Sequence, residues 1–208
     1  MSLSKEQSNF LKLVGIISMT LDHIGKVFYP QYIIFQILGR VAFPLFAYQL
    51  TIGFEKTSNR KKYLERLLIF ALLSQPIFYL VTKKLELNIL FTLALGFWAL
   101  SSWEKAKYHH FLFIFFLSLF VEYQIYGILM ILGFFVIKKF LFQILYFGFN
   151  NLIYLVLWNV PFFQFYSLLS LLFIYKINFL KVKLPKYFFY IFYPGHLLVI
   201  YLTKTLIR

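Results

Sequence analysis

The 208-residue sequence is poor in charge: only 13% of its residues are Asp, Glu, Lys or Arg, whereas 62% are hydrophobic and 23% are aromatic. A soluble domain carries about 25% charged residues. A soluble protein of this length has too little interior to bury so many apolar side chains. The composition therefore excludes a soluble enzyme, a disordered chain and a secreted disulfide scaffold, and it predicts a protein that lies mostly within a lipid bilayer.

Cysteine is absent and acidic residues are scarce. Without cysteine the chain has no disulfide, no thiolate nucleophile and no sulfur ligand for a metal, and we expect no metal site. Only 7 Asp and Glu stand against 21 Lys and Arg, a formal net charge of +14. The aromatic residues lie in apolar runs rather than between the basic residues, so we expect no nucleic-acid partner.

Three sets of motifs are also missing: a glycine-rich phosphate loop, a G-x-S-x-G nucleophile elbow and an H-E-x-x-H zinc motif. Their absence argues against an ATPase, a serine hydrolase of that type and a zincin protease. No convincing internal repeat is found either. The chemistry of this chain must therefore be sought in single polar residues within the apolar stretches.

Nine apolar stretches predict membrane helices. They lie at 10–28, 32–54, 66–81, 87–103, 110–121, 124–138, 140–158, 163–176 and 187–203. The fifth and sixth are short and could form one bent element, so the expected number is eight to ten. The predicted fold class is all-α, a polytopic integral membrane helical bundle that forms a single domain over 1–208. We interpret the first stretch as a retained span, because no small-residue cleavage site follows it.

The basic residues predict an orientation for these helices. With a cytoplasmic N-terminus, fifteen Lys and Arg fall on the cytoplasmic side and four on the outer side. Lys and Arg collect in the cytoplasmic loops of membrane proteins, so this asymmetry favours a multi-pass protein whose N-terminus is cytoplasmic. The four outer residues are Lys83, Lys84, Lys204 and Arg208.

Charged groups inside the first two stretches are candidates for a functional site, because an unpaired charge within a bilayer is costly. Asp22, the only aspartate of the chain, lies at a depth close to that of Arg40 and four residues before Lys26. An Asp22–Arg40 pair and an Asp22–Lys26 pair are both possible, and both could form together. His23 follows Asp22, and their side chains diverge by about 100° around a helix. His23 is thus either a helix–helix hydrogen bonder or a group that faces a reaction.

Other polar residues fall at the same depth. Pro44 cannot donate a backbone hydrogen bond to the carbonyl of Arg40, so the stretch 39–44 should be kinked, either for packing or to line a cavity. Further polar groups on the outer side are Asn88, Thr92, Glu122, Tyr126 and His196. We expect the polar residues of this level to share one cavity.

The densest basic run is 55–62, which contains Arg60, Lys61 and Lys62. It is either an ordinary cytoplasmic loop that touches anionic lipid or the mouth of a site for a phosphate-bearing donor such as coenzyme A.

Seven motifs together resemble the TraX family, in the order in which that family carries them. They are MTLDHIG at 19–25, LGRVAFPLFAY at 38–48, NRKKYLERL at 59–67, NILFT at 88–92, EY at 122–123, YG at 126–127 and YPGHL at 193–197. The resemblance covers most of the chain and is weakest over 135–185. The family is named for a conjugation protein that acetylates the N-terminus of F-type pilin, and it is similar to the transmembrane acyltransferases.

The resemblance implies an acyltransferase of the bacterial cytoplasmic membrane, with acetyl-CoA as donor substrate, no permanently bound cofactor, and a pilin-like protein or an envelope glycan as acceptor. His23 would be the general base, with His196 as second choice, because imidazole titrates near neutral pH. Arg40, with Asn88 or His196, would stabilise the oxyanion, and Asp22 would balance Arg40. The alternatives are a proton-coupled permease and a non-catalytic assembly factor for a pilus or envelope complex.

Overall fold

The computed structural model describes residues 3–176, 181–185 and 187–207, and their regular structure is entirely helical. Its elements are α1 (Lys5–Phe28), α2 (Ile33–Gly39), α3 (Ala42–Lys56), α4 (Arg60–Thr82), α5 (Ile89–Glu104), α6 (His110–Ser118), α7 (Gln124–Val136), α8 (Phe140–Trp158), the 3₁₀ helix η1 (Phe162–Leu169), α9 (Ser170–Tyr175) and α10 (Phe188–Leu206). The predicted all-α class is confirmed. If α2 with α3, and η1 with α9, are each counted once, the described residues form nine helical segments, at the nine predicted positions.

Local sequence signals explain where the first helices begin and break. Ser4 and Gln7 form a capping box at the start of α1: the Ser4 hydroxyl accepts from the Gln7 backbone N–H, and the Gln7 side chain accepts from the Ser4 N–H. Pro44 lies in the first turn of α3, where a helix needs no backbone donor, and α2 has ended five residues earlier at Gly39. The predicted break between 39 and 44 is confirmed.

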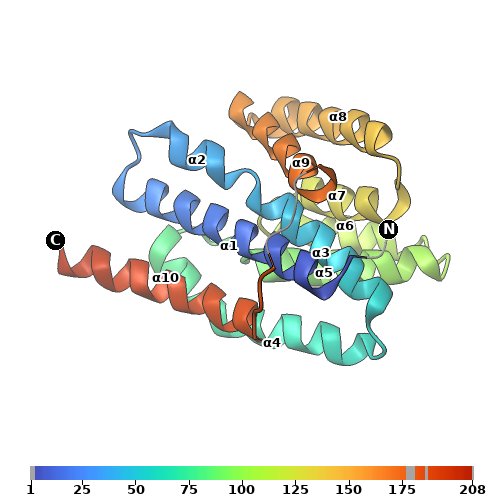
Figure 1. Ribbon diagram of the computed structural model, residues 1–208, viewed down its shortest axis with the longest axis horizontal. Helices are drawn as coiled ribbons and strands as arrows, with labels where there is room; N and C mark the ends of the chain where they lie inside the picture. The colour runs from blue at the N-terminus through green and yellow to red at the C-terminus, as the bar shows by residue number, and fades with distance from the viewer. Residues whose placement is uncertain (1–2, 177–180, 186, 208) are drawn as a thin grey trace.

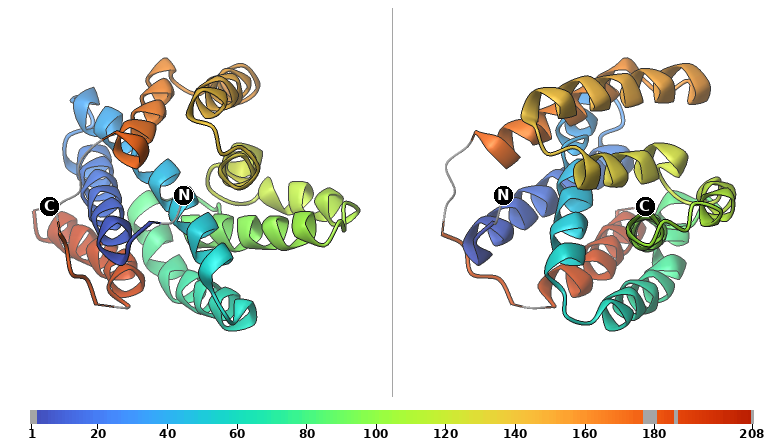
Figure 2. Two further views of the ribbon diagram at one scale, coloured as in Figure 1. Left: turned by 45° about the vertical axis from the view of Figure 1, so that its right-hand side comes forward. Right: turned by 90° about the vertical axis from the view of Figure 1, so that its right-hand side faces the viewer.

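Helix α3 is the central element, and twelve of its fifteen residues are buried. It contacts α1, α5, α7, η1 and α9, and the two views of Figure 2 show it passing through the middle of the bundle. Helix α1 packs between α2 and α10 on one side of α3, and α10 also packs on α4. As a result, α1 and α10, the first and last helices of the described residues, lie side by side (Figure 1).

The outer faces of the bundle are strongly apolar. Leu112 is 77% exposed, Val156 68% and Leu72 64%, which is unfavourable in water and favourable in lipid. Within the described residues, three helical segments are long and apolar enough to cross a bilayer: Ile33–Lys56, Arg60–Thr82 and Phe140–Trp158. Shorter apolar helices lie at Ile89–Glu104, Gln124–Val136 and Phe162–Tyr175. The prediction that all nine segments cross a membrane goes beyond these findings and stays a prediction.

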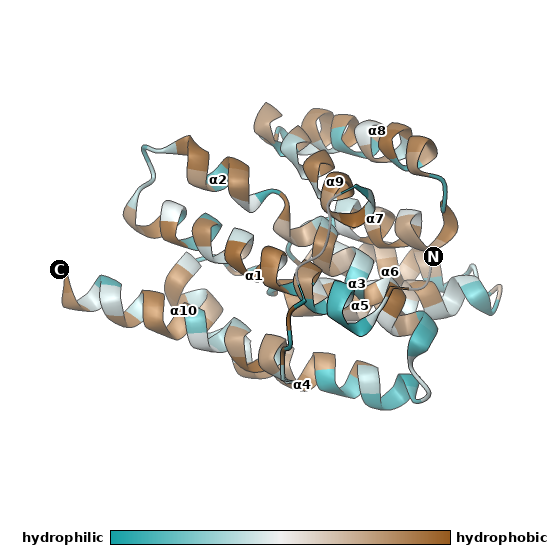
Figure 3. Ribbon diagram, in the orientation of Figure 1, coloured by the Kyte–Doolittle hydropathy of each residue, from teal (hydrophilic) through white to brown (hydrophobic). Residues whose placement is uncertain are grey.

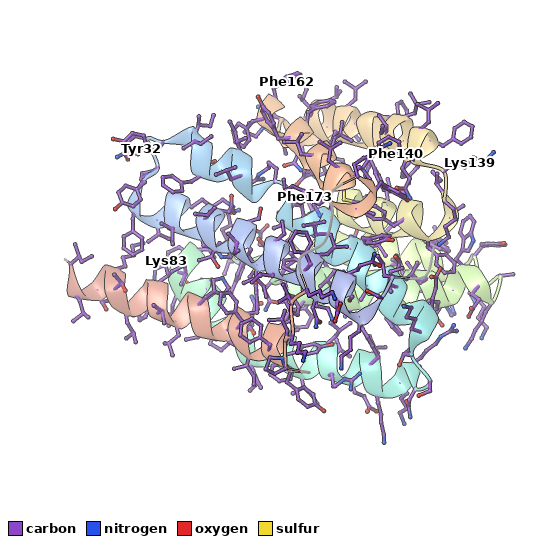
Figure 4. All side chains as sticks on the ribbon, viewed as in Figure 1. Tyr32, Lys83, Lys139, Phe140, Phe162 and Phe173 are labelled. Atoms are coloured by element: carbon purple, nitrogen blue, oxygen red, sulfur yellow. The ribbon has the colours of Figure 1, made fainter. Side chains whose placement is uncertain are left out.

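The two ends of the bundle differ in charge. In Figure 1 the N-terminus and the α3–α4, α5–α6 and α7–α8 connections lie at the right, whereas the α1–α2 connection and the C-terminus lie at the left. Figure 4 places Lys139 at the right end and Lys83 at the left, and in Figure 3 the start of α4, near the right end, is strongly hydrophilic. The basic end is therefore the end that we expect to face the cytoplasm.

Because the chain has no cysteine, single-cysteine variants can test this orientation. We expect Lys83→Cys to react with a membrane-impermeant maleimide on spheroplasts, and Lys139→Cys to react only after the membrane is permeabilised. The opposite pattern would reverse the orientation, and labelling of both variants without permeabilisation would contradict insertion in the membrane.

Candidate functional site

A buried ion-paired cluster joins α1 to the break between α2 and α3. Asp22 accepts from Lys26 Nζ at 2.5 Å through Oδ2 and from Arg40 Nη2 at 2.7 Å through Oδ1. The sequence left open which of the two cations would pair with Asp22, and the structure contains both pairs. Asp22 is only 6% exposed, so removal of one partner would leave a costly charge in the interior.

The other two nitrogens of Arg40 also donate hydrogen bonds. Its Nε donates to the Gln36 carbonyl at 3.1 Å, and its Nη1 donates to Gln164 Oε1 at 3.0 Å. Gln164 Nε2 in turn donates to the Tyr126 hydroxyl at 3.2 Å, so the predicted binding residue Tyr126 reaches the ion pairs through Gln164. Sequence reasoning missed Gln164, although a glutamine within an apolar run is the same kind of signal that identified Asp22.

Gly39 makes room for this cluster. A Cβ atom at position 39 would lie 2.4 Å from Asp22 Cβ and 2.6 Å from Asp22 Oδ1. The hydroxyl of Ser18 also donates to the Leu38 carbonyl across the same helix pair. Helices α1 and α2 thus approach closely at this point, and only glycine allows the carboxylate to sit there.

Two histidines that are 173 residues apart form a pair. Nδ1 of His23, on α1, lies 2.9 Å from Nε2 of His196, on α10, and both residues are buried. Asp22 makes no hydrogen bond with His23, in agreement with the predicted divergence of these neighbours on the helix. The partner that orients His23 is therefore the second histidine and not the aspartate.

The hydrogen bonds of His196 determine which ring atoms carry protons when both rings are neutral. His196 Nδ1 lies 2.9 Å from the Phe192 carbonyl, which can only accept, so this nitrogen carries the hydrogen. Nε2 of His196 is then the acceptor, and His23 Nδ1 donates to it. It follows that Nε2 of His23 carries no hydrogen and keeps its lone pair.

A small cavity lies beside this pair. Its polar lining consists of Asp22, His23, Glu122, Tyr123 and Tyr193, from α1, the α6–α7 connection, and α10. The Tyr193 hydroxyl is buried, interacts with the Ile89 backbone and makes no hydrogen bond to a side chain of the described residues. The observed cavity is thus smaller than the expected one. It includes Asp22, His23 and Glu122. Arg40 and His196 lie next to it, bonded to Asp22 and His23 respectively.

Asn88 and Thr92 are outside the lining of this cavity and form hydrogen bonds that hold the backbone. Asn88 caps α5 by accepting from the Leu90 N–H, and both hydrogens of its amide are used, at 2.8 Å each, by the Ala71 carbonyl and Gln75 Oε1. Thr92 donates to the Glu122 carbonyl at 2.5 Å. Thr92 thus holds the Glu122 backbone beside the cavity, whereas Asn88 has no free amide hydrogen to offer a ligand.

The basic run at the start of α4 lies at the opposite end of the bundle from the α6–α7 connection, which carries Glu122. Arg60 forms an ion pair with Glu104 and stacks on the Phe54 ring, 4.0 Å from its centroid. Lys61 and Lys62 are exposed. None of the three belongs to the lining of the cavity beside the histidines. Nor do any three His, Asp or Glu residues in the described ranges cluster closely enough to hold a metal ion.

Comparison with known proteins identifies relatives. A family model described as "TraX protein" matches residues 7–204. The "Probable fimbrial assembly protein FimC, serogroup H1" of Dichelobacter nodosus is 36% identical over 110 residues, which are 43% of this chain and 43% of that protein. An uncharacterised protein of Rickettsia prowazekii (strain Madrid E) is 31% identical over 100 residues, or 46% of this chain and 38% of that protein. The chain thus matches less than half the length of each relative. No solved structure matches it.

The close approach at Gly39 predicts a steric effect on stability. We expect Gly39→Ala to destabilise the protein by about 1–3 kcal/mol, because its Cβ would displace the Asp22 side chain. Gly148→Ala on α8 is the matched control: no atom lies within 4 Å of its Cβ position, and alanine favours a helix by up to about 1 kcal/mol. Thermal unfolding of the purified variants measures both. Equal stability of the two variants would contradict the tight packing of Asp22 against α2.

Proposed function

Because the chain belongs to the TraX family, we propose that it is a membrane-embedded acyltransferase that moves an acetyl group from acetyl-CoA to an amine or hydroxyl of an acceptor in the cell envelope. The observation that carries this proposal is the His23–His196 pair, which leaves one imidazole nitrogen with its lone pair beside a buried polar cavity. An oriented histidine in such a place is suited to take a proton from an acceptor.

In the proposed reaction, Nε2 of His23 takes the proton of the acceptor N–H or O–H while the acceptor atom attacks the thioester carbon. A tetrahedral intermediate with a negatively charged oxygen forms. The C–S bond then breaks, and the thiolate of coenzyme A leaves with the proton returned by His23. His196 acts as a positioning residue, because its hydrogen bond to His23 Nδ1 fixes the tautomer in which Nε2 is the base.

The oxyanion needs positive charge or hydrogen-bond donors. Arg40 supplies charge close to the cavity, through its pair with Asp22. Asn88 is no longer a suitable second donor, because its amide hydrogens are both committed. The buried hydroxyl of Tyr193, which belongs to a residue that lines the same cavity, takes this role in the proposal.

The proposed location is a bacterial cytoplasmic membrane, with the basic end of the bundle in the cytoplasm. The apolar outer faces and the unequal charge of the two ends support it. The name of the Dichelobacter relative, a fimbrial assembly protein, supports a pilus-related role. We therefore propose a pilin-like protein as the first acceptor to test and an envelope glycan as the second.

The roles of the two histidines predict different losses. With membranes that contain the protein, radiolabelled acetyl-CoA and candidate acceptors, we expect His23→Gln to lower acetyl transfer by about 100-fold or more, the usual contribution of a general base. His196→Gln keeps an oxygen that can accept from His23, so it should lower transfer less and displace the pH profile.

His109→Gln, a change of an exposed histidine in the α5–α6 connection, is the control and should leave transfer unchanged. A larger loss in His196→Gln than in His23→Gln would reverse the two roles. Absence of transfer to every acceptor, together with dissipation of a solute gradient by the same membranes, would replace the proposed activity by transport.

A further inference from the structure

A second, larger pocket of about 500 Å³ opens at the basic end of the bundle. The first half of α1, the second half of α3, the start of α4 and the start of α10 surround it. Four cationic side chains line it, and the lining contains no Asp or Glu. The four cations are Lys5, Lys12, Lys56 and Arg66.

These four cations have no acidic partner among the described residues, although Lys56 Nζ donates to the Leu3 carbonyl at 2.6 Å. At the same end of the bundle, Arg60 pairs with Glu104, and Lys138 pairs with Glu55 at 2.9 Å. Among the described residues, by contrast, no carboxylate lies within 4.0 Å of any of the four lining cations. A concentration of unpaired positive charge in a partly enclosed pocket favours an anionic ligand.

Arg66 and Lys12 are the most informative of the four. The guanidinium of Arg66 interacts with the Tyr190 hydroxyl, but its buried Nε atom has no hydrogen-bond partner among the described residues. Lys12 is partly buried on α1. A buried donor without a partner costs free energy, and a phosphate oxygen in the pocket would satisfy it with a charge-assisted hydrogen bond.

The rest of the lining has two parts. Near the N-terminus of α1 it is polar, with hydroxyl and amide groups from Ser4, Ser8, Asn9 and Gln49. Toward the interior it is apolar, with Phe46, Leu50, Leu67 and Leu93. The pocket is therefore shaped for an extended molecule with a phosphate-bearing end and a less polar arm that points into the bundle.

The apolar part lies in the direction of the two histidines. Lys5, Lys12 and His23 are separated by seven and eleven residues, close to two and three whole helical turns, so they lie along one face of α1. Lys12 and His23 are about 16 Å apart along the helix axis, at 1.5 Å per residue. Figure 1 shows α1 running lengthwise through the bundle from the basic end.

We propose that this pocket binds the phosphate groups of the acyl donor through Lys5, Lys12, Lys56 and Arg66, with the thioester arm lying along α1 toward His23. The inference rests on the proposed acyl transfer and assigns its donor site. It replaces Arg60, Lys61 and Lys62 as the donor contacts, since those residues are either paired or exposed outside the pocket. The phosphate of an anionic lipid headgroup has the same chemistry and is the competing occupant.

Binding of coenzyme A to the purified full-length protein in neutral-lipid nanodiscs, measured by titration calorimetry, tests the proposal without any need for turnover. We expect Lys12→Gln and Arg66→Gln each to raise the Kd about tenfold, the effect of losing one charge-assisted hydrogen bond. Lys12→Arg should bind within about threefold of the unchanged protein, because it keeps the charge. Lys107→Gln, which removes an exposed cation at the same end, is the matched control and should leave the Kd unchanged.

The remaining outcomes separate the donor site from the activity and from lipid binding. Coenzyme A binding that depends on Lys12 and Arg66, without transfer to any acceptor, would support the site and contradict the activity. Acetyl transfer with a Kd that neither substitution changes would overturn the site and leave the activity standing. If coenzyme A does not bind, while phosphatidylglycerol nanodiscs raise the unfolding temperature of the unchanged protein and not that of Lys12→Gln, the occupant is a lipid headgroup and the proposal fails.

Discussion

The carboxylate of Asp22, held between Arg40 and Lys26, is the interaction on which the rest of this arrangement depends. A single aspartate in an apolar bundle is tolerated only if it is paired, and here it is paired twice. Each pair requires a particular backbone: Lys26 lies one turn along α1, and Arg40 comes within reach because α2 ends at Gly39 and leaves space for the carboxylate. The ion pairs thus fix α2 against α1, and with it the rotation of α1 that turns His23 toward α10.

A series of hydrogen bonds extends from Arg40 to residues of other helices. Gln164 accepts from Arg40 and donates to Tyr126, whose hydroxyl bonds to Asn151. These residues come from η1, α7 and α8, so a chain of hydrogen bonds connects the ion pairs to elements on the other side of α3. In a medium of low polarity each of these groups requires a partner. Such a chain is a physical reason for the elements around the cavity to keep one arrangement.

The positions of the helices could be predicted from the sequence, because a helix that faces lipid or a protein core is a local apolar run with recognisable ends. The Asp22–Arg40 and Asp22–Lys26 pairs could be anticipated as well, since buried charge must be compensated. The His23–His196 pair could not be derived from spacing: its partners are on the first and last helices, and only the packing of α1 on α10 joins them. The lining of the pocket at the basic end could not be derived from the sequence for a related reason. A high density of charge in sequence marks an exposed loop, whereas the lining of the pocket combines single cations from α1, α3 and α4 that are each unremarkable in sequence.

Helix α1, which carries His23, differs from the other helices in composition. It contains five charged residues, whereas α8, of similar length, contains none. Most of these charges belong to the two sites: Lys5 and Lys12 line the pocket, Asp22 lines the cavity beside His23, and Lys26 pairs with Asp22. A helix with this much charge is unstable against lipid, so the apolar helices must cover it, and the covering keeps the cavity beside His23 shielded from bulk water. The charged residues that require this cover are therefore largely the same ones that line the pocket and the cavity.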